Sequence, residues 1–176
     1  MMISKFKQKI ARLFLSSERY ARYIGVNIGQ GCYISTKCFS SEPYLITIGN
    51  NVRIAKNVCF FTHGGIWPLR KQTDDLDYFG KISIGNNCYI GQDVKILPGI
   101  TIEDNCIVGT GSVVTKSIRK GYVVAGNPAK YIGTTEDFLN NIRTFNCRTK
   151  SYSAAAKKKF LMNAPDELFI RKKFIE

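Results

Sequence analysis

The only histidine of this 176-residue chain, His63, lies in the stretch FFTHGGIWPL. Imidazole is the side chain that changes charge nearest neutral pH, so it can take a proton from a hydroxyl group that attacks an electrophile. A regular sequence pattern breaks just after His63 and resumes in the same phase at Ile84. A histidine at the root of such an interruption is a candidate general base, whereas within the regular pattern it would be interpreted as structural.

The pattern has a period of six residues. Apolar residues open its successive units, namely Ile28, Ile34, Ile48, Ile54, Phe60, Ile84, Ile90, Ile96, Ile102, Val108 and Val114. A period of six fits neither a helix nor simple alternation, but it fits a short strand followed by a turn. Three such units make one coil, so equivalent positions of successive coils should stack on one another. Gly and Asn runs such as Gly49-Asn50-Asn51 and Gly85-Asn86-Asn87 suit left-handed or tight conformations at its corners.

Four of the six cysteines fall at one position of the repeat, where other units have small or β-branched residues. They are Cys32, Cys38, Cys88 and Cys106. The chain has no C-x-x-C pair, so these cysteines are interpreted as small core residues rather than as metal ligands or disulfides.

The interruption is a long polar loop. Phe60 and Ile84 are 24 residues apart, which is a whole number of units, and 18 of these residues form an added loop, IWPLRKQTDDLDYFGKIS, at residues 66–83. A loop of this length in a compact domain is usually functional or disordered. Trp67 within it could stack on a sugar face, so we expect it to contact an acceptor.

The repeat, with GTGSVVTKSI (109–118) and VVAGNPAKYIG (123–133), resembles the hexapeptide-repeat acyltransferases, in particular the sugar O-acetyltransferases of surface polysaccharide biosynthesis. The resemblance covers about residues 24–133. It implies a mainly β fold, a left-handed parallel β-helix, in which His63 is the general base that deprotonates a sugar hydroxyl as it attacks acetyl-CoA. It also implies a homotrimer with each active site between two copies.

The resemblance further implies a set of acetyl-CoA contacts that form one ladder from His63 along the helix. They are Gln92, Thr110, Thr115, Lys116 and Lys130. No metal is expected, because the metal hydratases that share this fold need several histidine ligands.

One departure concerns the residue that orients the histidine. Gly64 follows His63, where many members of the family have an acidic residue. The partner must then come from elsewhere. Glu42 is a candidate, because it lies at the comparable corner one coil earlier once a two-residue insertion near Ser41 is allowed for. Aspartates of the loop are alternatives: Asp74, Asp75 and Asp77.

The segments on either side of the repeat are expected to be helical. Residues 1–23 form an N-terminal amphipathic basic helix, and for residues 1–16 two roles remain open: capping the end of the β-helix, or docking on an anionic membrane surface. Residues 134–176 form a helical tail, with helices expected over 135–145 and 165–174, and SAAAKKK (153–159) as a solvated turn or helix face.

The net charge is +13, but aromatic and basic residues do not alternate as they do in nucleic-acid-binding motifs. No nucleic-acid partner is therefore expected. No apolar run approaches the roughly 20 residues of a membrane span, and lysines interrupt any signal-peptide core. We expect the protein to lie in the cytoplasm, either free or at the inner face of the membrane.

The expected activity is O-acetylation of a sugar hydroxyl in capsule, exopolysaccharide or lipopolysaccharide biosynthesis. Two alternatives remain open: N-acetylation of a nucleotide-linked amino sugar, and a non-catalytic β-helix scaffold. A scaffold would be recognised by loss of His63 or of the VTK and NPAK segments, and all three are present. No residue decides which sugar accepts the acyl group or at which position.

Overall fold

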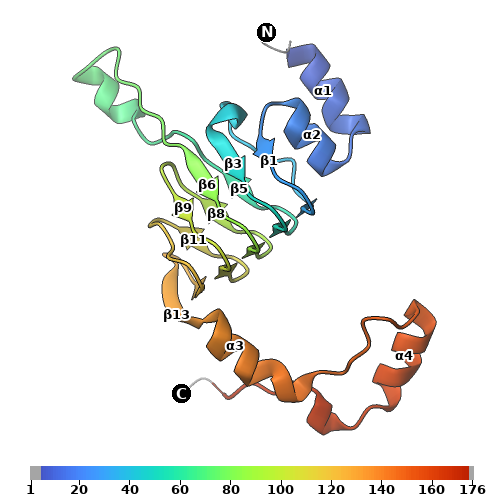
Figure 1. Ribbon diagram of the computed structural model, residues 1–176. Coiled ribbons are helices and arrows are strands. Elements are labelled where there is room, and N and C mark those ends of the chain that lie inside the picture. Colours follow the sequence, from blue (N-terminus) through green and yellow to red (C-terminus); the bar gives the residue numbers. More distant parts are fainter. Residues whose placement is uncertain (1–4, 175–176) are drawn as a thin grey trace. The chain divides into compact units, whose positions relative to one another are not determined.

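A computed structural model describes residues 5–174 (Figure 1). The chain divides into two compact units, Met1–Thr135 and Glu136–Glu176. The first unit contains helices α1 (Lys5–Phe14) and α2 (Ser17–Tyr23), followed by short strands. Among the described residues, no helix is long and apolar enough to cross a lipid bilayer.

The strands of the first unit form three sheets. Sheet A contains β1 (Asn27–Ile28), β3 (Ile46–Ile48), β6 (Ile82–Ile84) and β9 (Thr101–Ile102). Sheet B contains β2 (Tyr33–Ile34), β4 (Arg53–Ile54), β7 (Tyr89–Ile90), β10 (Ile107–Val108), β12 (Tyr122–Ala125) and β13 (Lys130–Thr134). Sheet C contains β5 (Cys59–Phe60), β8 (Lys95–Ile96) and β11 (Val113–Val114). Neighbouring strands are parallel except β12 and β13.

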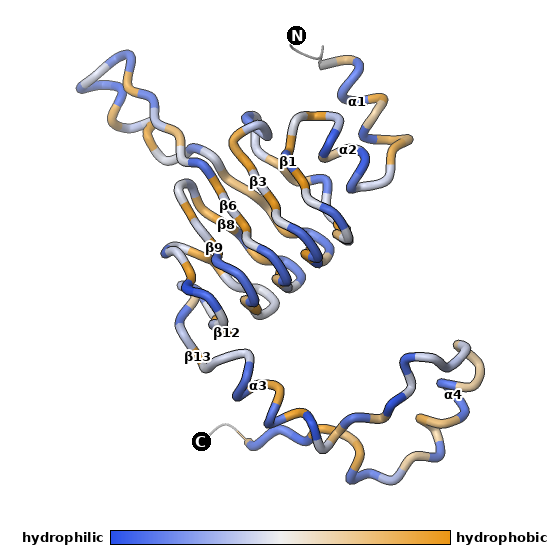
Figure 2. The backbone as a smooth tube through the Cα atoms, in the orientation of Figure 1, coloured by the Kyte–Doolittle hydropathy of each residue, from blue (hydrophilic) through white to orange (hydrophobic). Residues whose placement is uncertain are grey.

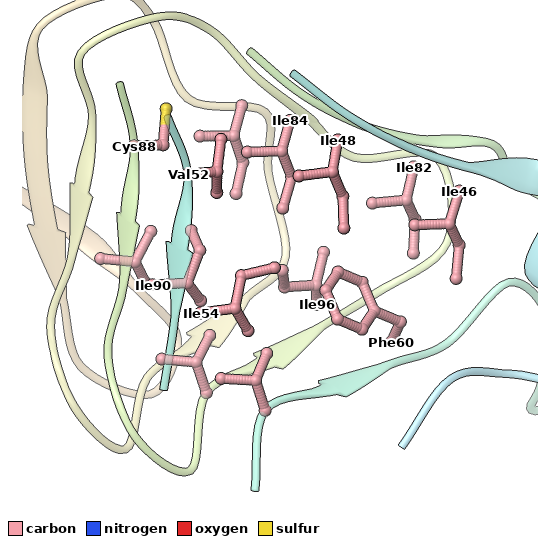
Figure 3. Close-up of a cluster of buried hydrophobic side chains, with 14 of the residues drawn as sticks. Ile46, Ile48, Val52, Ile54, Phe60, Ile82, Ile84, Cys88, Ile90 and Ile96 are labelled. Carbon is pink, nitrogen blue, oxygen red and sulfur yellow. The ribbon is translucent and has the colours of Figure 1, made fainter. Parts of the chain in front are cut away.

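The chain visits sheets A, B and C in turn, so the fold is a parallel β-helix with three faces. Residues that open the six-residue units pair in register with one another, as Ile48 does with Ile84 and Phe60 with Ile96 (Figure 3). Each opener is at most 6% exposed. Outward and inward residues alternate along the short strands of the coils, such as β4 and β7, and hydrophilic and hydrophobic residues therefore alternate along the coils (Figure 2). The repeat predicted this core correctly.

Asparagines form several corners of the coils in the left-handed backbone region. Asn51 and Asn87 have φ of 55°, and Asn57 and Asn105 have φ of 59°. A short polar side chain tolerates this conformation better than other non-glycine side chains do. The expectation that Asn-containing segments turn the chain is therefore confirmed. Two of the expected core cysteines, Cys88 and Cys106, are buried, Cys32 and Cys38 are half-buried, and all six cysteines are free.

Two insertions, in successive coils, lengthen the 18-residue distance that otherwise separates stacked residues. Ile28 pairs with Ile48, two positions later than one coil would place its partner, and the extra residues are absorbed near a short helical turn, η1 (Pro43–Leu45). Ile48 pairs with Ile84, and the segment between them holds one coil plus the long loop.

The loop contains a helical turn, η2 (Trp67–Lys71), and closes on itself. The Gly80 N–H donates a hydrogen bond to the Thr62 carbonyl oxygen at 2.7 Å. Gly80 also passes so close to the next coil that a Cβ there would lie 2.1 Å from the Gly99 nitrogen, so only glycine fits. The two ends of the loop are thus held together against the β-helix.

Helix α2, not α1, supplies the cap at the N-terminal end of the β-helix. Tyr20 and Ala21 of α2 are buried, and Ala21 is part of the main core. Arg22 donates to the carbonyl oxygens of Ile28 and Gly29, which satisfies backbone groups of the first coil. The cap is therefore α2, which belongs to the N-terminal segment 1–23 and follows residues 1–16 directly.

The second unit contains the later helices. Helix α3 spans Thr135–Ile142, at the junction of the units, and continues as the turn η3 (Arg143–Phe145). Helix α4 spans Ala154–Asn163, and the Ser153 hydroxyl caps it by accepting the Ala156 N–H.

The expected helix over 165–174 is wrong, because this segment has only a short turn, η4 (Asp166–Leu168). The α4 segment has a cap followed by alanine, lysine, leucine and methionine, which are strong helix formers. Residues 169–174 instead combine aromatic and β-branched residues with consecutive basic ones.

Candidate active site

The C–A corner, where the chain passes from sheet C to sheet A, carries the candidate catalytic residues. His63 follows β5 of sheet C and precedes the loop that leads to β6 of sheet A. Glu42 lies at the same corner one coil earlier, after the bridge of Cys38 to Cys59 and directly before η1. The insertion that forms η1 therefore places a carboxylate beside the histidine of the next coil.

Glu42 and His63 are joined by a short hydrogen bond. His63 Nδ1 lies 2.7 Å from Glu42 Oε2. The same oxygen accepts the Thr62 hydroxyl at 2.6 Å, and Thr62 is completely buried. The Phe79 ring, from the returning end of the loop, contacts the imidazole edge-on at a centroid distance of 5.7 Å. The imidazole is thus held on two sides, while 40% of the His63 side chain and 16% of the Glu42 side chain remain exposed.

The environment keeps Glu42 ionised. Burial tends to raise the pKa of this carboxyl, but the hydrogen bonds from Thr62 and His63 outweigh it, and the pKa lies below its ordinary value. An ionised carboxylate only accepts hydrogen bonds, so Nδ1 of His63 carries the proton. In the neutral imidazole, Nε2 is then the basic nitrogen, and it forms no hydrogen bond with the described part of the chain. The site can therefore accept a proton at Nε2.

The loop aspartates are not the partners of the histidine. Asp77 accepts the N–H of Tyr78, its own neighbour, and Asp74 lines a cavity with Trp67. Of the candidates, Glu42 alone is hydrogen-bonded to His63. Sequence reasoning missed Thr62 and Phe79. Thr62 stands directly before the histidine, at a position that faces inward. A polar residue at such a position indicates a hydrogen-bond partner nearby, and this signal was present in the sequence.

Thr115 and Lys116 lie at the C–A corner two coils beyond His63. They follow β11, which pairs through β8 with β5. The NPAK segment lies against this end of sheet C, because the Ala129 N–H donates to the Val113 oxygen at 2.8 Å. Lys116 and Lys130 therefore line one cavity of about 320 Å³, in which two ammonium groups and two tyrosines could hold the phosphates and adenine of a nucleotide-like group.

Gln92 and Thr110 lie at a different corner. They follow β7 and β10 of sheet B, where the chain passes to sheet C, and the Gly111 N–H bonds to the Gln92 oxygen. The expected single ladder from His63 through all the acetyl-CoA contacts is therefore wrong within one copy of the chain. Sheet C separates this B–C corner from the C–A corner.

Trp67 lies on η2 in the loop and is 80% exposed. It lines a cavity of about 600 Å³ together with Pro68, Arg70, Lys71 and Asp74. The Arg70 guanidinium lies over its ring, 6.0 Å from the centroid. The loop thus presents an open aromatic surface with polar groups around it. Within residues 5–174, no cluster of His, Cys, Asp and Glu has the number needed to hold a metal ion.

A β-helix of six-residue units, with a carboxylate–histidine pair at one corner, has the architecture of a hexapeptide-repeat protein. The protein-family model described as Bacterial transferase hexapeptide (six repeats) matches residues 81–116 of the chain. Protein CapG of Staphylococcus aureus is 44% identical over 151 residues, which cover 84% of this chain and 88% of CapG. The chain therefore belongs to the bacterial hexapeptide transferases, as the repeat predicted.

Other relatives carry enzymatic names. Galactoside O-acetyltransferase of Escherichia coli (strain K12) is 38% identical over 112 residues, which cover 64% of this chain and 55% of that protein. A maltose O-acetyltransferase from Clostridium difficile 630 superimposes with a TM-score of 0.55 at 28% identity, covering 74% of this chain and 84% of that one. A galactoside acetyltransferase in complex with coenzyme A gives a TM-score of 0.55 at 31% identity, covering 70% and 72%.

Proposed function

We propose that the protein is an acetyl-CoA-dependent O-acetyltransferase that modifies a sugar hydroxyl in the biosynthesis of capsule or another surface polysaccharide. The Glu42–His63 pair carries the proposal, because it is a base oriented by an ionised carboxylate and open to solvent. The names of CapG and of the galactoside and maltose O-acetyltransferases support the class of acceptor. The left-handed winding of the coils, implied by the family, is part of the proposal.

In the proposed mechanism, His63 Nε2 removes the proton of the acceptor hydroxyl as the hydroxyl oxygen attacks the acetyl carbonyl carbon. Acetyl-CoA supplies the activated thioester. A C–O bond forms, the C–S bond breaks, and the imidazolium returns the proton to the departing thiolate sulfur. The Glu42 carboxylate stabilises the imidazolium and fixes the ring, because its hydrogen bond to Nδ1 becomes charge-assisted. The products are the sugar ester and the free thiol.

The activity can be tested by thiol release from acetyl-CoA with a panel of soluble sugars, lipid-linked glycans and nucleotide sugars. We expect thiol release with an acceptor that carries free hydroxyls, and a product whose acetyl group is removed by mild alkali. An alkali-stable product formed on an amino sugar would establish N-acetylation instead. Absence of thiol release across the whole panel would contradict the proposal and favour a scaffold.

The acetyl-CoA site is expected to depend on the lysines of the 320 Å³ cavity. Lys116→Ala and Lys130→Ala should each raise the KM for acetyl-CoA about tenfold and change kcat much less, because phosphate contacts are remote from the reacting carbon and contribute uniform binding. Steady-state kinetics with varied acetyl-CoA measure this. Lys150→Ala, an exposed lysine of the second unit, is the charge-matched control. If the KM is unchanged in both variants, the lysines do not hold the phosphates.

The acceptor is expected to contact the loop. Trp67→Ala should raise the KM for the sugar about tenfold and leave the KM for acetyl-CoA unchanged, since stacking of an aromatic ring on a sugar face would be lost. Leu69→Ala, on the same helical turn but outside the cavity, is the matched control. Equal sugar kinetics in the Trp67 variant and the parent would remove Trp67 from the acceptor site.

A homotrimer would reconcile the two corners. If three copies close a ring with sheet C facing the axis, the C–A corner of one copy adjoins the B–C corner of the next, because these corners flank the same sheet. Gln92 and Thr110 of one copy would then complete the acetyl-CoA site of its neighbour. Light scattering should give three times the 19.8 kDa of the chain. A fully active monomer would contradict this arrangement.

A further inference from the structure

Helix α1 packs on the molecule with its less apolar face. The half-buried residues in and next to the helix are Gln8, Ala11 and Leu15, which lie on one side of it. The larger apolar residues point away: Phe6 is 73%, Leu13 78% and Phe14 82% exposed. A helix that simply packed against the protein would bury the opposite face. The apolar face of α1 is therefore available to something outside the described chain.

The exposed apolar residues form a continuous surface. Phe6, Ile10, Leu13 and Phe14, called here the α1 stripe, fall within an arc of roughly 100° at 3.6 residues per turn. In the same projection Lys7 and Lys9 lie at its two edges. Figure 2 shows hydrophobic and hydrophilic residues in turn along α1. The stripe is not needed to cap the β-helix, because α2 does so.

The charge of α1 indicates what covers the stripe. The ten residues KFKQKIARLF contain four basic side chains and no acidic one. An apolar arc with lysines at both edges matches the boundary between lipid headgroups and acyl chains, where the arc enters the apolar layer and the ammonium groups meet phosphates. A protein groove would need a partner that is both apolar and acidic, whereas an anionic lipid surface supplies both properties at once.

We propose that α1 docks the protein on an anionic lipid surface, with the helix axis in the plane of the membrane and the α1 stripe inserted. Lys7 and Lys9 contact lipid phosphates at the edges of the stripe. A helix of this length gives reversible binding, which several copies of the chain in one assembly would strengthen through multivalency. This inference goes beyond the proposed function and does not depend on it.

Co-sedimentation of the full chain with vesicles tests the proposal. We expect binding to vesicles that contain phosphatidylglycerol, little binding to phosphatidylcholine alone, and loss of binding at high salt. Leu13→Glu/Phe14→Glu should abolish binding. Met162→Glu/Phe174→Glu, which makes the same charge change at two exposed apolar residues of the second unit, should not. Lys7→Ala and Lys9→Ala should each weaken binding about fivefold.

The outcomes are separated by two further measurements. Thermal unfolding and light scattering should give the same midpoint and mass for the parent and for Leu13→Glu/Phe14→Glu, because the stripe contributes little to the core. Equal vesicle binding by the stripe variant, or none by the parent, would overturn the proposal. A reduced mass of the stripe variant, with no vesicle binding by the parent, would show instead that the stripe joins copies of this chain.

Discussion

His63→Ala is expected to lower kcat by roughly two to four orders of magnitude and to leave acetyl-CoA affinity unchanged. In the proposed mechanism the imidazole is the proton acceptor at the corner, and its Nε2 is the ring nitrogen that does not contact Glu42. Alanine removes that group without disturbing the buried residues of the coil, because the His63 side chain is partly exposed. Thiol release measures kcat, and calorimetry with coenzyme A measures affinity.

The pH dependence gives a second measure of the same residue. In the parent, kcat/KM should fall as the pH is lowered, because Nε2 must be free of a proton to act as the base. In His63→Ala this dependence should disappear. Turnover near that of the parent in the alanine variant would refute the mechanism, and His63 would then be a structural corner residue.

Glu42→Gln is expected to lower kcat by about one to three orders of magnitude. Glutamine keeps the size of the side chain but loses the charge that stabilises the imidazolium, and its amide can donate to Nδ1 and reverse the tautomer. The KM for acetyl-CoA should not change, because Glu42 contacts the imidazole and not the cofactor, so the loss falls on kcat. Glu42 is a positioning residue in this mechanism.

Asp75→Asn is the matched control, since Asp75 is an acidic residue of the loop and is exposed. It should leave kcat unchanged. If Asp75→Asn lowered kcat and Glu42→Gln did not, the orienting carboxylate would belong to the loop.

The depressed pKa of Glu42 also predicts how stability changes with pH. A carboxyl whose pKa is lower in the folded state stabilises the fold above its unfolded pKa, and this contribution is lost as the pH falls through the folded pKa. The parent should therefore lose thermal stability in that acid range more steeply than Glu42→Gln. Thermal melts at several pH values compare the two slopes. Parallel slopes would mean that the pair does not hold the carboxylate ionised.

The repeat made the β-helix predictable, because each six-residue unit contains its own strand and turn. Ile84 and Ile90 needed no knowledge of distant residues to be assigned to the core. The division of the expected acetyl-CoA contacts between two corners was also present in the sequence. Gln92 and Thr110 are separated by three units of the repeat, which is one full coil, and therefore share a corner. Gln92 and Lys116 are separated by four units and cannot share one.

The Glu42–His63 contact could be suggested but not established from the sequence. It depends on where the chain absorbs the two extra residues before β3, and a shift of one position would point the carboxylate elsewhere. The environment of α1 was not predictable either. Its spacing shows an apolar face, but only tertiary packing shows that this face is uncovered while α2 fills the end of the coil.

The hydrogen bond between Gly80 and Thr62 closes the loop at its base, so the loop can vary independently of the β-helix. Since the coil resumes in register beyond it, the segment 66–78, which contains neither His63 nor Phe79, can lengthen, shorten or change composition without moving a core side chain. Each doubling of its length adds only about 0.6 kcal/mol of closure entropy. Members of the family could therefore differ in this loop, and so in the acceptor they bind, at little cost in stability and with the same catalytic residues.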